Sequence, residues 1–278
     1  MTVVSIKLVA LILLSLLVVW LAWSRYRMRQ RIRQLYREID SLKMRGAEFV
    51  ANVSHELKTP LTSIKGFAET LKSGAVQDPQ RAIEFLSRIE NNAERLSLLI
   101  NDILDLSKIE SPNVHLDHEC FNPAEELDDL IKDFGVKLHS RGQQLSISNK
   151  VDSLVADRRL FDQVIRNLVE NAHRYCGDGA RIDISSERVI EQGETYNRFT
   201  VSDNGPGISA EDLPRIFERF YRTDKSRNRL LGGTGLGLAI VKHIMMSHGG
   251  FVRVASEPFK GSSFSIYFPL EKRPPILS

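Results

Sequence analysis

His55 stands in the sequence beside a carboxylate and one helical turn before a hydroxyl group. Glu56 follows it directly, Thr59 lies four residues further on, and Pro60 comes next. An imidazole next to a carboxylate can lose its proton and act as a nucleophile, and in a helix the spacing of four puts Thr59 on the same face as His55. Pro60 has no N–H for the carbonyl of Glu56, so we expect the helix to bend or loosen there. The alternative is an ordinary surface histidine, and these residues alone leave both open.

Two glycine-rich segments in the second half of the chain have the composition of a nucleotide site. In the first, 203–207, glycines would let a ligand approach closely and Asp203 could accept a hydrogen bond from an exocyclic amine. A tight turn explains these residues equally well. The second, 232–237, opens a predicted helix, whose free N–H groups and dipole would face an anion. Neither is a Walker or dinucleotide motif, because no Gly-Lys-Ser/Thr and no suitably spaced acidic residue follows.

A predicted helix over 157–175 carries two amides and a cation on one face: Asn167, Asn171 and Arg174. Such a face could meet a metal–phosphate group, because Mg²⁺ takes hard oxygen ligands and few of them need come from protein. A solvated helix face is the alternative. The opposite stripe is apolar and should face the core; it consists of Leu160, Val164, Leu168 and Ala172.

The pattern from residue 113 onward mixes strands and helices without a strict βαβ repeat. Strands are predicted at 144–149, 181–187, 198–202, 251–256 and 262–268. Helices are predicted at 123–139, 157–175 and 235–248, with a short one near 210–218. This order predicts an α/β sandwich, with helices over one face of a mixed sheet, rather than a Rossmann fold.

Two long helices precede this region and must position His55. Apolar residues recur in steps of four and three over 28–53 and again over 82–103, and Gly74, Asp78 and Pro79 mark the turn between the helices. A lone amphipathic helix would explain the first seam, but narrow, regular seams are typical of paired helices. We therefore expect a homodimer in which two all-α hairpins form a four-helix bundle.

The N-terminal residues predict a membrane anchor. Residues 3–23 are apolar apart from Ser5, Lys7 and Ser15, span about 31 Å as a helix, and end with Trp20 and Trp23. A cleaved signal peptide is the alternative, but no small-residue cleavage site follows. The next segment, 25–45, holds eight basic and two acidic residues. By the positive-inside rule we expect the chain to cross the cell inner (cytoplasmic) membrane once and everything after Arg25 to lie in the cytoplasm.

The excess of basic residues is concentrated in the segment 25–45. The net charge is only +3, so the basic residues of 25–45 suit anionic membrane lipids and do not indicate nucleic-acid binding. The composition, 42% hydrophobic and 26% charged, excludes a disordered or fibrous chain. Cys120 and Cys176 form no C-x-x-C pair, and a disulfide is not expected in a reducing compartment. His115, His118 and Cys120 lack a fourth metal ligand nearby.

Residues 49–61, with the sequence FVANVSHELKTPL, resemble the phosphoacceptor box of the sensor histidine kinases of two-component systems. The resemblance implies that His55 takes the γ-phosphoryl group of ATP and that Glu56 serves as general base. It implies that Thr59 positions water for dephosphorylating the partner. That partner would be the receiver domain of a response regulator, whose Asp accepts the phosphoryl group from His55.

Four later segments resemble, in order, the nucleotide boxes of the GHKL-type ATP-binding domain of this family. They are the N box at 167–172, the first glycine box at 203–207, the F box at 217–222 and the second glycine box at 233–237. The resemblance implies a mobile lid over 223–231 as well. The ATP-binding residues that it implies are Asn167, Asn171, Arg174, Tyr175, Asp203, Gly205, Gly207, Arg222, Lys225, Gly233, Thr234, Gly235, Leu236 and Gly237.

The same resemblance implies individual roles. Asn171 would ligate Mg²⁺ with Asn167 in support, Asp203 would read the adenine amine, and Tyr175 would line the base pocket. Arg222 or Lys225 would reach the γ-phosphate. Arg174 stands where many members have Lys, so a bidentate fork replaces a point charge.

The expected domains are an anchor at 1–24, a basic juxtamembrane coiled-coil helix at 25–48, a phosphotransfer hairpin at 49–112, an ATP-binding domain at 113–272 and a tail at 273–278. The expected activity is that of an ATP-dependent protein-histidine kinase, similar to the phosphate-responsive subgroup. One alternative is an ATPase; related ATPases place a Glu base at the position of Asn167, and an amide cannot deprotonate water. The other is a catalytically silent dimeric adaptor, which would normally show damage at the site residues.

Overall fold

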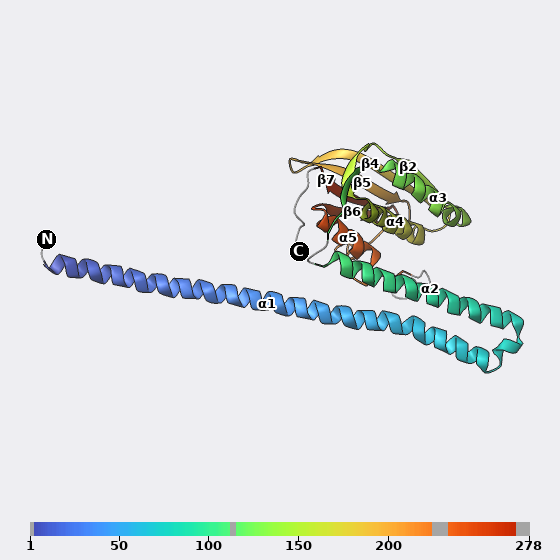
Figure 1. Cartoon of the computed structure of the whole chain (residues 1–278), viewed down its shortest axis with the longest axis horizontal. Helices are drawn as coiled ribbons and strands as arrows, with labels where there is room; N and C mark the ends of the chain where they lie inside the picture. The colour runs from blue at the N-terminus through green and yellow to red at the C-terminus, as the bar shows by residue number, and fades with distance from the viewer. Residues whose placement is uncertain (1–2, 112–114, 224–232, 271–278) are drawn as a thin grey trace. The chain divides into compact units, whose positions relative to one another are not determined.

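The computed structural model describes residues 3–111, 115–223 and 233–270 (Figure 1). The side chains of 3–19, 21, 22, 38, 41, 42 and 45 are outside the described part as well. The chain divides into two units, Met1–Lys58 and Thr59–Ser278. The predicted tail at 273–278 and most of the predicted lid lie outside the described residues.

The first unit is the N-terminal part of one long helix, α1 (Val3–Lys72). The helix continues through Pro60 without a break. Among the side chains that the structure describes, no helix has a stretch long and apolar enough to cross a membrane. Most side chains of the predicted anchor are not described, so the anchor stays a prediction. Four seam residues on α1 are exposed in the single chain: Met28, Ile32, Leu35 and Ile39.

The second unit begins with the turn of the hairpin. After α1 ends at Lys72, a short 3-10 helix η1 (Ala75–Gln77) leads to α2 (Pro79–Ile109). Asp78 caps α2 by accepting hydrogen bonds from the backbone N–H groups of Gln80 and Arg81, at 3.1 and 3.3 Å. The predicted turn is therefore confirmed, with Pro79 in the first turn of the helix, where its missing N–H costs nothing.

Helix α2 has two apolar stripes. Leu86 and Ile100, from the predicted seam, remain about half exposed in the single chain. A second stripe, which the sequence pattern did not single out, is buried and consists of Leu99, Leu106 and Ile109. Because α2 packs against α5 (Gly237–Ser247), the C-terminal half of α2 belongs to the core of the second unit.

Within the described residues, the C-terminal region contains a five-stranded mixed sheet of order β2-β4-β5-β7-β6. The strands are β2 (Gln144–Ser148), β4 (Arg181–Glu191), β5 (Glu194–Asp203), β6 (Phe251–Glu257) and β7 (Gly261–Pro269). Only β2 and β4 pair in parallel. A separate antiparallel pair joins β1 (His118–Phe121) to β3 (Leu154–Asp157).

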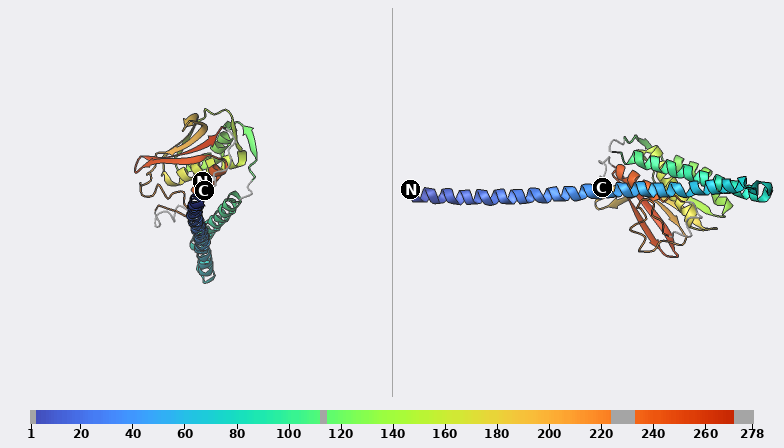
Figure 2. Two further views of the ribbon diagram at one scale, coloured as in Figure 1. Left: turned by 90° about the vertical axis from the view of Figure 1, so that its left-hand side faces the viewer. Right: turned by 90° about the horizontal axis from the view of Figure 1, so that it is seen from below.

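Three helices cover one face of this sheet: α3 (Ala124–Ser140), α4 (Arg158–Tyr175) and α5 (Figure 2). Phe161 of α4 lies at the centre of the core, with ring centroids 5.0 Å from Phe199 and 5.8 Å from Phe268. Strand alternation puts hydroxyl pairs such as Thr200 and Ser265 on the opposite face. The expected α/β sandwich, with helices on one face of a mixed sheet, is confirmed.

The differences from the predicted elements have local causes. Strands β4 and β5 are longer than predicted because a tight turn at Gln192 and Gly193, both with positive φ, joins them into one hairpin. Strands β1 and β3 were not predicted; they are four residues each and too short for a periodic pattern. The predicted short helix near 210–218 is wrong. Pro214 lacks an N–H, and turns closed by hydrogen bonds between residues three positions apart form instead, for example from the N–H of Arg215 to the carbonyl of Asp212 at 2.8 Å.

Candidate functional site

His55 lies on α1 with its imidazole open to solvent. Its side chain is 68% exposed, and Nδ1 lies 3.8 Å from Oε1 of Glu56, a carboxylate that is only 26% exposed. Thr59 comes one turn later on the same helix. An exposed imidazole beside a carboxylate is accessible to an incoming phosphoryl donor.

Helix α4 positions the predicted amide and cation face. Asp157 caps the helix by accepting from the N–H of Leu160 at 3.1 Å. The predicted apolar stripe is buried in the core, and it leaves Asn167, Asn171 and Arg174 half-buried on one side of the helix. The sequence prediction of this face is therefore confirmed in its placement.

Asn167 has an unusual environment. Its Nδ2 is buried and has no hydrogen-bond partner among the described residues. Its Oδ1 lies 3.6 Å from the position that a Cβ on Gly237 would take, so the amide faces the first residue of α5. A buried, unpaired amide is costly unless something absent from the protein itself satisfies it. An unpaired N–H donor beside the start of α5 fits a phosphate oxygen, and the amide oxygens of Asn167 and Asn171 are of the kind that Mg²⁺ takes, although no cluster of three His, Cys, Asp or Glu suited to a metal occurs among the described residues.

The first glycine segment begins at the end of β5, where Asp203 accepts a hydrogen bond from the N–H of Gly205 at 2.9 Å. A Cβ on Gly205 would lie 2.6 Å from Cα of Cys176, so the segment packs directly on the residue that follows α4. A Cβ on Gly207 would lie 2.0 Å from the carbonyl oxygen of Glu257. Burial raises the pKa of Asp203 and, with the nearby Asp203 charge, raises the pKa of Cys176 to about 11.

The second glycine segment meets the C-terminal turn of α4. A Cβ on Gly233 would lie 2.9 Å from Nη1 of Arg174 and 3.0 Å from the hydroxyl oxygen of Tyr175. Arg174 also pairs with Glu170 at 3.0 Å. The structure thus brings two residues at the end of the N-box helix to a residue of the second glycine box, and a side chain at Gly233 would displace the flexible ends of Arg174 and Tyr175.

The F box supports the second glycine segment through the backbone. The N–H of Phe220 donates to the carbonyl of Gly235 at 2.9 Å. Leu236 is fully buried and immediately precedes α5, whose first residue is Gly237. Arg222 is described and half-buried, whereas Lys225 lies outside the described residues. The expected contact of Arg222 or Lys225 with the γ-phosphate therefore stays a prediction.

Three carboxylates of α2 contact this region, and the sequence reasoning missed all of them. Asp102 accepts from the hydroxyl of Thr234 at 2.5 Å, and Asp105 accepts from Nε2 of Gln163 at 2.7 Å. Glu110 pairs with Arg219 and lies 3.1 Å from Nε2 of His243. No motif marks these residues, because isolated acidic residues on a helix usually indicate only a solvated face.

Burial shifts the titration of these groups. It raises the pKa of both Asp102 and Glu110, and hydrogen bonds from Thr234 and Arg219 oppose the effect. Burial lowers the pKa of His243 to about 4, so this imidazole is neutral at pH 7. Asp102 and Glu110 of α2 thus contact Thr234 in the second glycine box and Arg219 in the F box.

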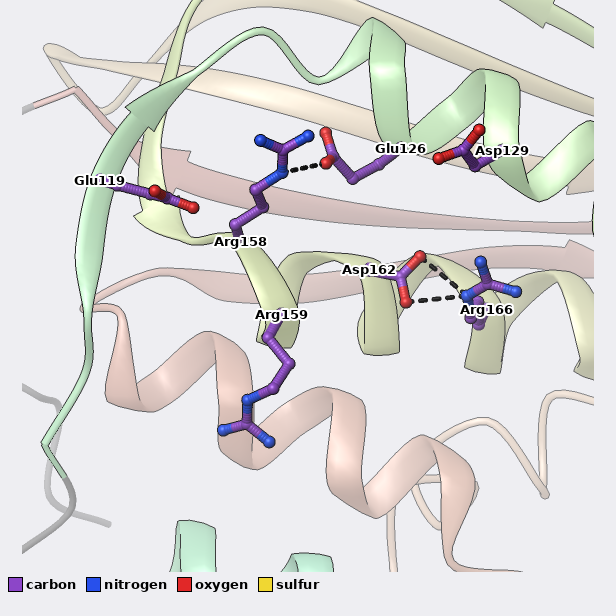
Figure 3. Close-up of a pocket in the computed structure, with 7 residues that line it drawn as sticks. All are labelled: Glu119, Glu126, Asp129, Arg158, Arg159, Asp162 and Arg166. Carbon is purple, nitrogen blue, oxygen red and sulfur yellow. Dashed lines mark hydrogen bonds and ion pairs between the residues drawn. The ribbon is translucent and has the colours of Figure 1, made fainter.

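A separate depression of about 400 Å³ lies between β1, α3 and the first half of α4 (Figure 3). Figure 3 shows Arg158 and Glu126 facing each other, while Arg159 points away from them. Arg166 bonds to Asp162 at 2.8 Å. None of the predicted site residues lines this depression. Arg158 and Arg166 are paired with carboxylates of the same protein, and the depression lies apart from the predicted nucleotide site.

Comparisons with known proteins agree with this geometry. Residues 47–112 match the His Kinase A (phospho-acceptor) domain, and residues 156–272 match the family described as histidine kinase-, DNA gyrase B- and HSP90-like ATPase. The sensor protein kinase WalK of Staphylococcus aureus is 37% identical over 226 residues, which cover 81% of this chain and 54% of the relative. The chain spans between about a third and about half of the length of the curated relatives that it matches.

Two solved structures share the arrangement. The Acinetobacter baumannii histidine kinase AdeS is 28% identical, with a TM-score of 0.63, over 78% of this chain and 98% of that one. The histidine kinase ThkA, solved in complex with the response regulator protein TrrA, is 27% identical, with a TM-score of 0.66, over 81% of this chain and 62% of that one. With a phosphoacceptor hairpin followed by an ATPase domain of this type, the chain belongs to the sensor histidine kinases.

Proposed function

We propose that the protein transfers the γ-phosphoryl group of ATP to His55 and then to an Asp of a response-regulator receiver domain. The convergence at the end of α4 carries the proposal. There Arg174 and Tyr175 meet Gly233, and the unpaired amide of Asn167 faces the start of α5. These groups lie where the resemblance expects ATP, in a chain that also carries an exposed histidine beside a carboxylate.

In the first step, Nε2 of His55 forms a bond to the γ-phosphorus, and the bond from that phosphorus to the bridging oxygen of ADP breaks. Glu56, whose Oε1 lies 3.8 Å from Nδ1, takes up the Nδ1 proton as the imidazole gains its phosphoryl group. Mg²⁺, held by Asn171 with support from Asn167, would neutralise phosphate charge. The protein contributes mainly position and charge: Arg174 on a phosphate, Asp203 on the adenine amine, and Tyr175 and the glycine segments as walls.

The remaining expectations belong to the same proposal. The exposed seams of α1 and α2 support a homodimer formed through the phosphoacceptor hairpin. A response regulator as partner is supported by the ThkA complex with TrrA. Dephosphorylation of that partner through Thr59, a single-pass anchor at 1–24, an inner-membrane location and lipid contacts of 25–45 rest on the sequence. So does the likeness to the phosphate-responsive subgroup.

The test is labelling of the full chain in detergent with γ-labelled ATP and Mg²⁺. We expect a label that is labile in acid, stable in base and absent from His55→Gln, with ATP binding intact in that variant. His139→Gln, which alters another exposed histidine, is the matched control and should label normally. Undiminished labelling of His55→Gln would exclude His55 as the acceptor. Asn171→Ala should lose Mg·ATP binding, and an unchanged nucleotide affinity would remove Asn171 from the site.

A further inference from the structure

Two side chains of the turn between α3 and β2 form hydrogen bonds to the last turn of α4. Arg141 donates through Nη1 to the carbonyl of His173 at 2.7 Å. Gln143 donates through Nε2 to the same carbonyl at 3.1 Å and to the carbonyl of Gly177 at 2.6 Å. The last carbonyls of a helix have no partner within the helix, so these two side chains act as its C-terminal cap.

Gln143 is unusual for a polar side chain because it is only 6% exposed and every polar group on it is bonded. Its Oε1 lies 2.5 Å from Nδ1 of His173, and its Nε2 also lies 3.4 Å from Sγ of Cys176. Two carbonyls face the nitrogen, which fixes the amide orientation, and Nδ1 of His173 must then carry the proton that Oε1 accepts. A hydrocarbon in its place would leave two buried carbonyls and one N–H with fewer partners.

The capped turn is the same turn that forms one wall of the nucleotide site. Between the bonded residues His173 and Gly177 lie Arg174 and Tyr175, which touch the glycine segment at Gly233, and Cys176, which touches Gly205. The backbone of Cys176 lies 2.6 Å from an added Cβ on Gly205, and the side-chain ends of Arg174 and Tyr175 lie within 3.0 Å of one on Gly233. A shift of the turn therefore moves the groups that face both glycine segments. The alternative is that Gln143 only stabilises the fold.

We propose that Gln143 is a positioning residue for the nucleotide, which sets the spacing between the last turn of α4 and both glycine segments. The inference rests on the proposed function. The side-chain hydrogen bonds of Gln143 go to His173, Cys176 and Gly177, none of which is a predicted ATP-binding residue, so Gln143 acts through them. Its loss weakens ATP binding and leaves the transfer step at saturating ATP unchanged, because His55 and Glu56 lie on another helix.

The experiment compares Gln143→Met, which keeps the length of the side chain and removes its polar groups, with Gln144→Met. Gln144 is the neighbouring residue and is exposed on β2, so it controls for the chemical change alone. Both are made in the full chain carrying Cys120→Ser. The chain has two cysteines, so Cys176 then remains as the single thiol and reports on the turn itself.

Three quantities are measured: KM for ATP, the labelling rate at saturating ATP, and the rate at which a maleimide modifies Cys176. For Gln143→Met we expect KM to rise about tenfold, which corresponds to the loss of about one buried hydrogen bond. The saturating rate should stay within about twofold, and the maleimide reaction should accelerate and be slowed again by ATP. Gln144→Met should resemble the parent in all three.

An unchanged KM for ATP in a folded Gln143→Met would overturn the inference. This holds whether or not the labelling rate at saturating ATP falls, and at any rate of Cys176 modification. If Gln143→Met does not fold, Arg141→Ala decides, because Arg141 bonds to the same carbonyl of His173. That variant should raise KM by about threefold, and an unchanged KM there would overturn the inference. A parent chain that neither binds ATP nor becomes labelled would instead refute the proposed function.

Discussion

Replacing Gly235 by alanine should markedly lower the unfolding temperature (Tm) of the ATPase domain. Gly235 has φ of +74°, and a Cβ there would lie 2.9 Å from Cα and 3.0 Å from the carbonyl carbon of Phe220. The left-handed conformation costs an alanine about 1–2 kcal/mol, and forcing a methyl group against packed backbone costs about 1–3 kcal/mol. The neighbour cannot yield easily, because Phe220 itself has φ of +62° and its N–H donates to Gly235.

The expected loss of stability is therefore about 3 kcal/mol, which lowers Tm by about 6–12 °C for a domain of this size. The assay is scanning calorimetry of the full chain, read at the transition of the ATPase domain. Gly237→Ala is the matched control. Gly237 has no positive φ, its added Cβ meets nothing nearer than 3.6 Å, and it opens α5, where alanine is a better helix former. Equal Tm losses in the two variants would refute the reasoning from backbone conformation.

Three further predictions follow from the same contacts. In a double-mutant cycle of Asp102→Ala and Thr234→Val, the coupling free energy of unfolding should be about 1–3 kcal/mol, and additive effects would show that the 2.5 Å contact contributes nothing. Burial lowers the pKa of His248, so the stability it contributes is full above about pH 6.5, the unfolded value, and is lost as pH falls. Its Nε2 accepts from the N–H of Asp157, so Tm of His248→Gln should fall less steeply between pH 7 and 5 than Tm of the parent; parallel curves would exclude His248 as the source. Thr59→Ala should label normally with ATP and dephosphorylate the response regulator more slowly, and equal phosphatase rates would exclude the role of Thr59.

The sequence predicted the elements whose pattern is long and periodic. The buried stripe of α4 and the turn at Gly74–Pro79 occur as predicted, because a repeated apolar spacing and a proline next to an Asp cap are local properties. The strand pair β1 and β3 was missed, because four-residue strands are defined by their partner across the sheet. The predicted short helix near 210–218 does not form, because Pro214 has no N–H to donate.

The site was predictable only as separate segments. Motif order located Asn167, Asp203 and Gly233, but nothing in the spacing showed that Arg174 and Tyr175 would meet Gly233 in space. The roles of the Gln143 amide and of the α2 carboxylates could not be predicted from the sequence for a related reason. Their roles depend on contacts between residues 30 or more positions apart, and each is an ordinary surface residue type in its own segment.

The carboxylates of α2 restrict how such proteins can exchange domains. A hairpin recombined with the ATPase domain of another relative keeps its acidic residues but receives new partners. Where the new domain offers no donor, a partly buried carboxylate loses its hydrogen bonds at a cost of about 1–3 kcal/mol each. A working hybrid should therefore carry over the matched sets Asp102 with Thr234, Asp105 with Gln163, and Glu110 with Arg219 and His243. Modularity at the level of whole domains thus depends on a few side-chain pairs that must be exchanged together.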